Sequence, residues 1–363
     1  MATTERSGRF LIYGATGYTG KLTARVAKAQ GLQPILAGRD EAKTRAVAAP
    51  HGFDWRAFDL DQASKLDAAL AEVDVVLHMA GPFSATSKPM ADACLRNGRH
   101  YLDITGEIDV FEALAARDAE AKAAGVMLLP GAGFDVVPSD CLAAHAKRRL
   151  PDATRLLLAI GGMAKMSRGT AKTSIEALSL GTRARRGGRI VRLPDTPRGS
   201  VDFGSGPVPT VALSWGDVAT AWHSTRIPDI DVHFQSSRQL EQMTKLGPVA
   251  RFMLSTRIGQ HFAKAAVDRQ PEGPTDAERA SGHATLVAQV WNAKGDTLRS
   301  RLRTPEGYTL TALSSLAIVE RVLAGDFKAG WQTPSLAYGA DFVLRLPGVT
   351  REDLGASQEN VAP

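Results

Sequence analysis

The chain is poor in cysteine and has no long apolar run, although it is 363 residues long. Its two cysteines, Cys94 and Cys141, have neither CxxC nor metal-ligand spacing. This excludes a disulfide framework and a cysteine-rich zinc site, and it is typical of a reducing cytosol. No charge-free stretch of about 18 apolar residues is present, and the N-terminal MATTERSGRF has no apolar signal region. We therefore expect a cytoplasmic protein without membrane spans.

Two signatures of common enzyme sites are also absent. None of the five tyrosines has a lysine four residues later, which excludes the Tyr-x-x-x-Lys signature of short-chain dehydrogenases. No histidine pair has metal-ligand spacing, and His78 lies inside an apolar run, where we expect a packed core histidine. We therefore expect no metal. The net charge of +6 favours anionic ligands but does not select among them.

Short apolar runs alternate with helical patterns in the first third of the sequence. The expected strands are 10–13, 33–37, 54–58, 73–79, 101–104 and 126–129. The expected helices between them are 20–29, 41–48, 62–71, 88–97 and 110–123. Alternation at this pitch predicts an α/β fold with a doubly wound parallel sheet of Rossmann type. Such a sheet binds its ligand at the carboxyl ends of its strands.

The regular alternation of expected strands and helices ends after Pro130. Longer strand-like segments at 154–160, 210–215, 229–234 and 284–291 are separated by glycine and proline. No βαβ repeat is visible there, so a second, mixed α/β domain is expected. Helical patterns follow at 308–324 and 335–346, and the polar tail from Arg351 is expected to be loose. We divide the chain into a nucleotide-binding domain at 1–130 and a second domain at 131–330 for substrate binding or oligomerisation.

A glycine-rich turn follows the first expected strand. In FLIYGATGYTG the glycines are spaced G-x-x-G-x-x-G, close to the dinucleotide fingerprint. Such a turn brings the backbone and a helix N-terminus to a phosphate. A glycine-rich turn without a ligand is the alternative, which the following sheet disfavours. The candidate cofactor-binding residues of this turn are Gly14, Thr16, Gly17, Tyr18 and Thr19.

The second strand ends in LAGRD, where an NAD site usually has an acidic residue for the ribose. Gly38 and Arg39 occupy this place, and an arginine can fork onto a 2′-phosphate. This favours NADP(H) as the cofactor. The alternative is a solvated Arg39, with Asp40 taking the ribose. Asp59, after the third strand, is a candidate neighbour of the adenine.

The fourth expected strand runs into MAGPFSA. Ala80, Gly81 and Pro82 would present backbone groups to the nicotinamide ribose at the carboxyl edge of the sheet. A strand-ending turn with no ligand fits the same residues.

Three residues are candidates for the proton donor that hydride transfer often needs. Glu107 follows the fifth strand, Asp135 follows the sixth, and Tyr308 precedes a helix. The carboxyl groups could be general acids if desolvation raised their pKa. The alternatives are helix caps or interdomain hydrogen bonds for the two acids, and packing for the tyrosine. Asp103 is expected to be a buried carboxylate that caps a turn, and Cys141 to be part of the core.

Several stretches together resemble the saccharopine dehydrogenase-like oxidoreductases, and within them the trans-acting enoyl reductases. They are GATGYTG, LAGRD, AGPF, ACLRNGRHYLDITGE, PGAGFDVVPSD, WGDVATA, RTPEGYTLTALS and GWQTPSLAYGADF, in this order along nearly the whole chain. The resemblance implies a Rossmann domain, an α/β substrate domain, and a return of the chain at 331–363 to the first domain. It also implies a nicotinamide cofactor, usually NADP(H). Asp135 matches an aspartate that saccharopine reductases carry after a Pro-Gly turn.

The enoyl-reductase branch implies reduction of a C=C bond in an acyl-type, lipid or polyketide-derived substrate. The first alternative is a saccharopine-type reaction at a C–N bond of an amino-acid adduct, which would require a polar pocket for carboxylates. The second alternative is a dinucleotide-binding scaffold or redox sensor that is not an enzyme.

Two segments bear on partners. Basic residues gather at 165–198, and the segment 243–267 is basic and amphipathic. The first could dock an acidic carrier, and either could contact an anionic membrane surface. The alternatives are a solvated charge run and a helix packed on its own domain. Nucleic-acid binding is not expected, because no aromatic residue interleaves with the charges. A homodimer is left open.

Overall fold

The computed structural model describes residues 8–162, 165–238, 240–241, 254 and 256–355, and it divides the chain into two compact units. The first unit comprises the residues up to Val137 together with Tyr308–Ala337. The second comprises Pro138–Gly307 and the residues from Tyr338 onward. Both contain a sheet with helices, so the expected α/β class is confirmed.

The first unit contains a seven-stranded sheet in the order β15-β6-β5-β4-β1-β2-β3, with every neighbouring pair parallel. Its strands are β1 (Phe10–Tyr13), β2 (Ile35–Gly38), β3 (Trp55–Ala57), β4 (Val75–His78), β5 (His100–Asp103), β6 (Met127–Leu129) and β15 (Gly330–Trp331). Helices α1 (Tyr18–Ala29), α2 (Glu41–Ala48), α3 (Ala63–Ala71), α4 (Phe83–Asn97), α5 (Ile108–Ala115) and α6 (Asp118–Ala123) connect them. Because β1, β2 and β4 are wholly buried, their sequences are mainly apolar and do not alternate with polar residues.

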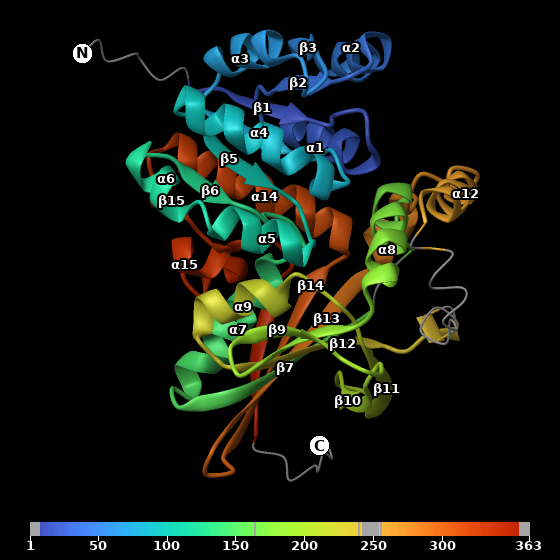
Figure 1. Ribbon diagram of the computed structural model, residues 1–363, viewed down its shortest axis with the longest axis vertical. Coiled ribbons are helices and arrows are strands. Elements are labelled where there is room, and N and C mark those ends of the chain that lie inside the picture. The colour runs from blue at the N-terminus through green and yellow to red at the C-terminus, as the bar shows by residue number, and fades with distance from the viewer. Residues whose placement is uncertain (1–7, 163–164, 239, 242–253, 255, 356–363) are drawn as a thin grey trace. The chain divides into compact units, whose positions relative to one another are not determined.

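The chain returns to the first unit over Tyr308–Ala337. There α14 (Gly307–Leu323) is followed by β15, whose Gly330 pairs with Met127 of β6. In Figure 1 the orange-red α14 and β15 lie among the blue and cyan elements of this unit. The segment expected to return was 331–363. The structure instead groups α14 with the first unit and the residues from Tyr338 with the second.

The second unit contains a mixed sheet in the order β10-β11-β12-β7-β13-β14-β16, with β8 and β9 attached at β12. Its strands are β7 (Ala153–Gly161), β8 (Arg183–Arg186), β9 (Arg189–Arg192), β10 (Arg198–Asp202), β11 (Pro207–Ala212), β12 (Asp229–Gln235), β13 (His283–Asn292), β14 (Thr297–Pro305) and β16 (Thr350–Leu354). Its helices include α7 (Val137–Arg149), α8 (Arg168–Leu180), α9 (Asp217–Thr225), α12 (Arg257–Val267) and α13 (Asp276–Ser281). The pair β7–β12 is parallel and the other neighbours are antiparallel.

Three expectations for individual elements are wrong. The helix expected at 110–123 is two helices, α5 and α6, and the helix expected at 335–346 is α15 (Pro334–Tyr338) followed by a 3₁₀ turn at Phe342–Arg345. Gly339, with φ of +84°, ends α15. The tail expected to be loose contains β16, which pairs with β14. Residues 356–363 lie outside the described residues.

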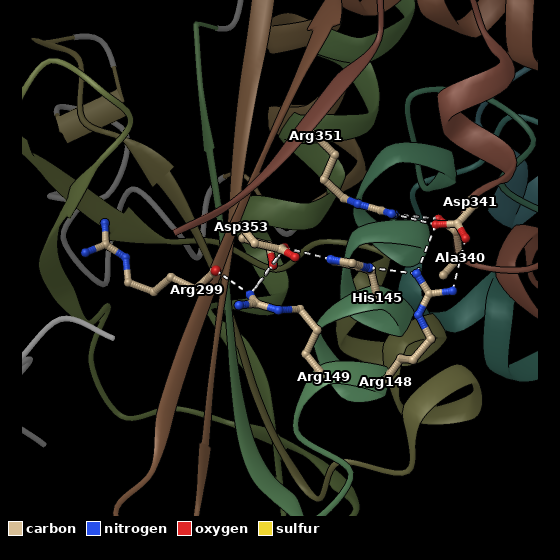
Figure 2. Close-up of polar contacts among 9 residues, drawn as sticks. His145, Arg148, Arg149, Arg299, Ala340, Asp341, Arg351 and Asp353 are labelled. Atoms are coloured by element: carbon tan, nitrogen blue, oxygen red, sulfur yellow. Dashed lines mark hydrogen bonds and ion pairs between the residues drawn. The ribbon is translucent and has the colours of Figure 1, made fainter. Parts of the chain in front are cut away.

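A polar network holds β16 against α7 (Figure 2). Asp353 of β16 accepts a hydrogen bond from Nε2 of His145 at 2.8 Å. Nδ1 of His145 accepts one from the Arg148 guanidinium at 3.0 Å. Asp341 pairs with Arg148 at 3.0 Å and with Arg351 of β16 at 2.6 Å. Charged pairs thus anchor this strand where its sequence, TREDL, offers little apolar surface.

Among the described helices, none combines the length and the apolar character needed to cross a bilayer.

Candidate functional site

The glycine turn lies at the carboxyl end of β1, and its geometry requires residues without a side chain at Gly14 and Gly20. Gly14 has φ of +89°, and a Cβ there would lie 2.7 Å from the backbone nitrogen of Ala80. A Cβ on Gly20 would lie 2.7 Å from Cα of Ala15, so the helix could not pack on the turn. Gly17 is the N-cap of α1 and supplies no side-chain cap, and the first turn of α1 has no acidic residue. The backbone and the positive end of α1 therefore fit a pyrophosphate.

The other candidate cofactor-binding residues of this turn lie beside its glycines. Thr16, Tyr18 and Thr19 are half-buried at the start of α1. Tyr18 packs edge to face against Tyr308 of α14, with ring centroids 5.0 Å apart and an interplanar angle of 83°. Tyr308 thus lies beside the glycine turn and contacts it through its ring.

The end of β2 offers a basic side chain rather than an acidic one. The carboxylate of Asp40 is engaged, since it accepts a hydrogen bond from Lys43 N at 2.9 Å and caps α2. Gly38 is buried and Arg39 is exposed beside it. Burial and the charge of Asp59 raise the pKa of Tyr13 to about 12, and Arg39 opposes this rise. Arg39 and Asp59 therefore both act on the end of β1, where the cofactor is expected.

Ala80, Gly81 and Pro82 connect β4 to α4, and Glu107 fastens this connection. Oε1 of Glu107 accepts a hydrogen bond from Phe83 N at 2.8 Å, and Oε2 accepts one from Ser84 N at 2.7 Å. The carboxylate therefore caps the N-terminus of α4. This geometry matches the helix-cap alternative for Glu107.

His78, at the end of β4, is buried among aromatic rings. Its Nε2 lies 2.9 Å from Oγ1 of Thr86, and burial lowers its pKa to about 3. The residues that the structure describes contain no group of histidine, cysteine and acidic side chains arranged to hold a metal ion. His78 is a neutral core histidine at neutral pH.

Asp135 has the most unusual environment of the three proton-donor candidates. The residue is partly accessible, but Oδ1 is withdrawn from solvent and has no hydrogen-bond partner among the described residues. A Cβ on Gly106 would lie 2.7 Å from Oδ2, so the carboxyl group fills the space that this glycine leaves. Desolvation raises the pKa of Asp135 to about 7. The carboxyl group is therefore available as an acid near neutral pH.

Two hydroxyl groups that the sequence analysis missed support the loop that carries Asp135. Oγ1 of Thr311 accepts a hydrogen bond from Phe134 N at 2.9 Å, and Oγ of Ser314 donates one to Ala132 O at 2.8 Å. Both residues lie on α14 and are buried. The sequence did contain a signal for this role. Thr311 and Ser314 lie three residues apart in the mainly apolar LTALSSLAIV, and residues at this spacing share one face of a helix.

All the predicted site residues thus belong to the first unit and follow the carboxyl ends of its strands, except Tyr308 on α14. The glycine turn, Arg39 and Asp59 lie around the ends of β1, β2 and β3. Ala80–Pro82, Glu107 and Asp135 follow β4, β5 and β6. The residues fit NADP(H), since the first turn of α1 has no acidic residue or side-chain cap and the only acidic side chain of LAGRD is already engaged.

Comparison with known proteins supports this interpretation. Residues 10–129 match the family described as the saccharopine dehydrogenase NADP binding domain. A trans-acting enoyl reductase of Mycobacterium leprae is 35% identical over 158 residues, which are 41% of this chain and 38% of that protein. A trans-acting enoyl reductase of Mycobacterium bovis is 26% identical across 96% of this chain and 97% of its own length.

The fold of the chain is also that of a solved structure. Saccharopine dehydrogenase (L-Glu forming) from Saccharomyces cerevisiae has a TM-score of 0.66 over 96% of this chain and 100% of its own, at 13% identity. The glycine turn, the parallel sheet and the family match agree on a nicotinamide dinucleotide cofactor. The chain is therefore an oxidoreductase whose residues 10–129 form an NADP-binding domain of the saccharopine dehydrogenase type, and 96% of it is similar to trans-acting enoyl reductases.

Proposed function

We propose that this oxidoreductase reduces a C=C bond of an acyl-type substrate with NADPH, and that Asp135 supplies the proton. The observation that carries the proposal is the Asp135 carboxyl group at the carboxyl edge of the dinucleotide-binding sheet. Its Oδ1 is buried beside Gly106 and has no hydrogen-bond partner among the described residues. The names of its relatives, trans-acting enoyl reductases, support the same reaction class.

The residues around the ends of β1 and β2 would hold the cofactor. The backbone of Gly14–Gly17 and the N-terminus of α1 would bind the pyrophosphate, and Arg39 would pair with the 2′-phosphate. Ala80–Pro82 would line the nicotinamide ribose, held in place by the cap that Glu107 forms on α4. Bound NADPH supplies a hydride to one carbon of the C=C bond.

Asp135 delivers the balancing proton. With a pKa of about 7, its carboxyl group is largely protonated in mildly acidic solution and about half protonated at neutral pH. It gives this proton to the carbon next to the one that has received the hydride, so the double bond becomes a single bond with one hydrogen added at each end. The carboxylate that remains is reprotonated by water, since the residue is partly accessible.

The proposal also includes the way in which the substrate arrives. A reductase that acts in trans receives its acyl group from another protein, and we propose an acidic carrier. Arg189 and Arg192 support this role because they are exposed on the β8–β9 hairpin. Lys165 and Lys172 contribute less, since they pair with Glu278 at 2.6 Å and with Asp268 at 2.5 Å. The alternative contact is a membrane surface. It is supported by Ile258 and Phe262 of α12, which are 72% and 70% exposed.

The experiment is a cofactor titration followed by a substrate screen. NADPH and NADH are titrated against protein fluorescence, and NADPH oxidation at 340 nm is then measured with enoyl thioesters and, separately, with pairs of an oxo acid and an amine. We expect tighter binding of NADPH and turnover of enoyl thioesters only. Turnover of the oxo acid and amine pairs would assign the C–N reaction instead. NADPH binding without oxidation in either screen would assign a scaffold or sensor.

A further inference from the structure

The end of β5 contains a buried acid that the reaction does not use directly. Asp103 is the last residue of this strand and has no exposed surface. Burying an ionisable side chain is costly unless hydrogen bonds compensate for the lost water. Burial raises the pKa of Asp103 to about 7, although hydrogen bonds from Thr105, Tyr101 and Gly131 oppose this rise. The groups that Asp103 binds must therefore account for a buried carboxyl group at this position.

Asp103 binds two loops at the same time. Its Oδ1 accepts hydrogen bonds from Thr105 N and from Gly131 N, both at 2.9 Å. Its Oδ2 accepts a hydrogen bond from the Tyr101 hydroxyl at 2.7 Å. The backbone oxygen of Asp103 accepts a further bond from Ala132 N at 2.7 Å. One oxygen atom thus joins the loop after β5 to the loop after β6.

These two loops form the surroundings of the proposed proton donor. The loop after β5 contains Gly106, and the loop after β6 leads to Asp135, whose Oδ2 lies against Gly106. The second loop is short and closed, since Val136 N donates to Gly131 O at 2.9 Å. A displacement of Gly131 would therefore be passed on to Asp135 within a few bonds.

We propose that Asp103 is a positioning residue for Asp135: by holding Thr105 and Gly131 on one oxygen atom, it keeps the Asp135 carboxyl group pressed against Gly106, with Oδ1 withdrawn from solvent. This inference rests on the proposed function, in which Asp135 is the proton donor. Asp103 itself touches neither substrate nor cofactor in this scheme. Its contribution is the environment that makes Asp135 a neutral acid near pH 7.

The test compares variants of Asp103 by the titration of Asp135. Asp103→Ser keeps a polar group in the cavity but withdraws the acceptor from both amides. Asp103→Asn keeps an oxygen at the position of Oδ1. Tyr101→Phe removes only the bond to Oδ2 and serves as the control. For each folded variant, the Asp135 carboxyl is titrated by carbon-13 NMR, with Asp135→Asn to assign the signal. NADPH affinity and the pH profile of enoyl turnover are measured beside it.

We expect Asp103→Ser to lower the pKa of Asp135 by about one unit or more, because the loosened loops admit water to its carboxyl group. Turnover should fall about 10- to 100-fold, while the dissociation constant of NADPH stays within about twofold. Asp103→Asn and Tyr101→Phe should keep the Asp135 pKa near that of the natural chain. If Asp103→Ser does not fold, Asp103→Glu, which moves the carboxylate by one methylene, replaces it with the same expected shift.

An unchanged Asp135 pKa in a folded Ser or Glu variant would overturn the inference. So would a loss of NADPH affinity that matches the loss of turnover, since this would give Asp103 a general structural role. The titration is independent of turnover. If Asp135→Asn keeps full activity, the proposed proton donor fails, whereas the NMR shift still decides whether Asp103 sets the environment of Asp135.

Discussion

Arg39 is the side chain on which the choice between NADPH and NADH is expected to depend. Asp40, the alternative partner of the ribose, caps α2 through Lys43 N. Charge-assisted hydrogen bonds contribute about 1.5–3 kcal/mol each. We therefore predict that Arg39→Ala weakens NADPH binding about 10- to 100-fold and changes NADH binding little.

Fluorescence titration with both cofactors measures this difference. Arg45→Ala is the matched control, because Arg45 is also exposed and lies nearby on α2. An equal loss for NADPH and NADH would make Arg39 an ordinary surface residue.

Tyr308 is expected to act through its ring rather than its hydroxyl group. The ring packs edge to face on Tyr18 of the glycine turn. We predict that Tyr308→Phe keeps turnover within about twofold, whereas Tyr308→Ala weakens NADPH binding several-fold by removing the aromatic contact. Steady-state kinetics and cofactor titration of both variants check this. A loss of turnover above about tenfold in the Phe variant would instead point to proton donation by the phenol.

The rate of reduction is predicted to fall as the pH rises through the pKa of Asp135, about 7, because the carboxyl group then loses the proton that it donates. Asp135→Asn should lower turnover about 10²- to 10⁴-fold and remove this pH dependence. The profile of kcat against pH measures both effects. Asp109→Asn, which removes an exposed carboxylate on α5, should behave like the natural chain. A profile that keeps its descending limb in Asp135→Asn would exclude Asp135 as the acid.

The candidate site residues other than Tyr308 were predicted from their places after strands, because parallel strands end at one edge of the sheet. The roles were harder to predict. Glu107 and Asp135 are both acids in loops after strands. Glu107 is held by two backbone amides, whereas Oδ1 of Asp135 has no hydrogen-bond partner in the described part of the chain. That distinction depends on neighbours such as Phe83 and Gly106, which sequence spacing does not place.

The polar network that anchors β16 is predicted to make the second unit sensitive to acid. Burial lowers the pKa of His145 below its ordinary value, so the folded chain binds a proton there less readily than the unfolded chain does. In the unfolded chain it takes a proton below about pH 6.5. Because the unfolded state then binds more protons, stability is full above this pH and falls as the pH decreases toward 5.

We predict that the melting temperature falls less between pH 7 and 5 in His145→Gln than in the natural chain, because part of the proton uptake on unfolding is removed. Thermal unfolding across this range measures the effect. His51→Gln, in the short turn after α2, is the control. An equal pH dependence in His145→Gln and the natural chain would contradict the prediction. The lowered pKa values of Asp341 and Asp353 act in a more acidic range, where those carboxylates gain protons.

The strands β1, β2 and β4 were predictable because their apolar runs are buried on both faces of a parallel sheet. The strand β16 was not, because TREDL is held by backbone pairing with β14 and by ion pairs rather than by an apolar face. The pattern of α14 predicted a helix correctly, but its apolar face does not reveal which unit it packs in.

The first unit is discontinuous in sequence, and this can be tested with fragments. Thr311 and Ser314 hold the loop that leads to Asp135, and Trp331 N donates to Asp118 at 2.9 Å. We predict that a fragment of residues 1–137 does not bind NADPH, because it lacks these bonds and the edge strand β15. Joining 308–337 to it through a flexible linker should restore binding. Circular dichroism and cofactor titration check both fragments, and full binding by residues 1–137 alone would contradict the prediction.

The same discontinuity sets an order of events during synthesis. A ribosome makes the chain from its N-terminus, and the segment Tyr308–Ala337 emerges only after the whole of Pro138–Gly307 has been translated. The nucleotide-binding unit therefore stays incomplete while Pro138–Gly307 of the second unit leaves the exit tunnel. We therefore expect loading of the dinucleotide to be a late step of biogenesis, since a chain whose translation stops before residue 308 lacks part of the first unit.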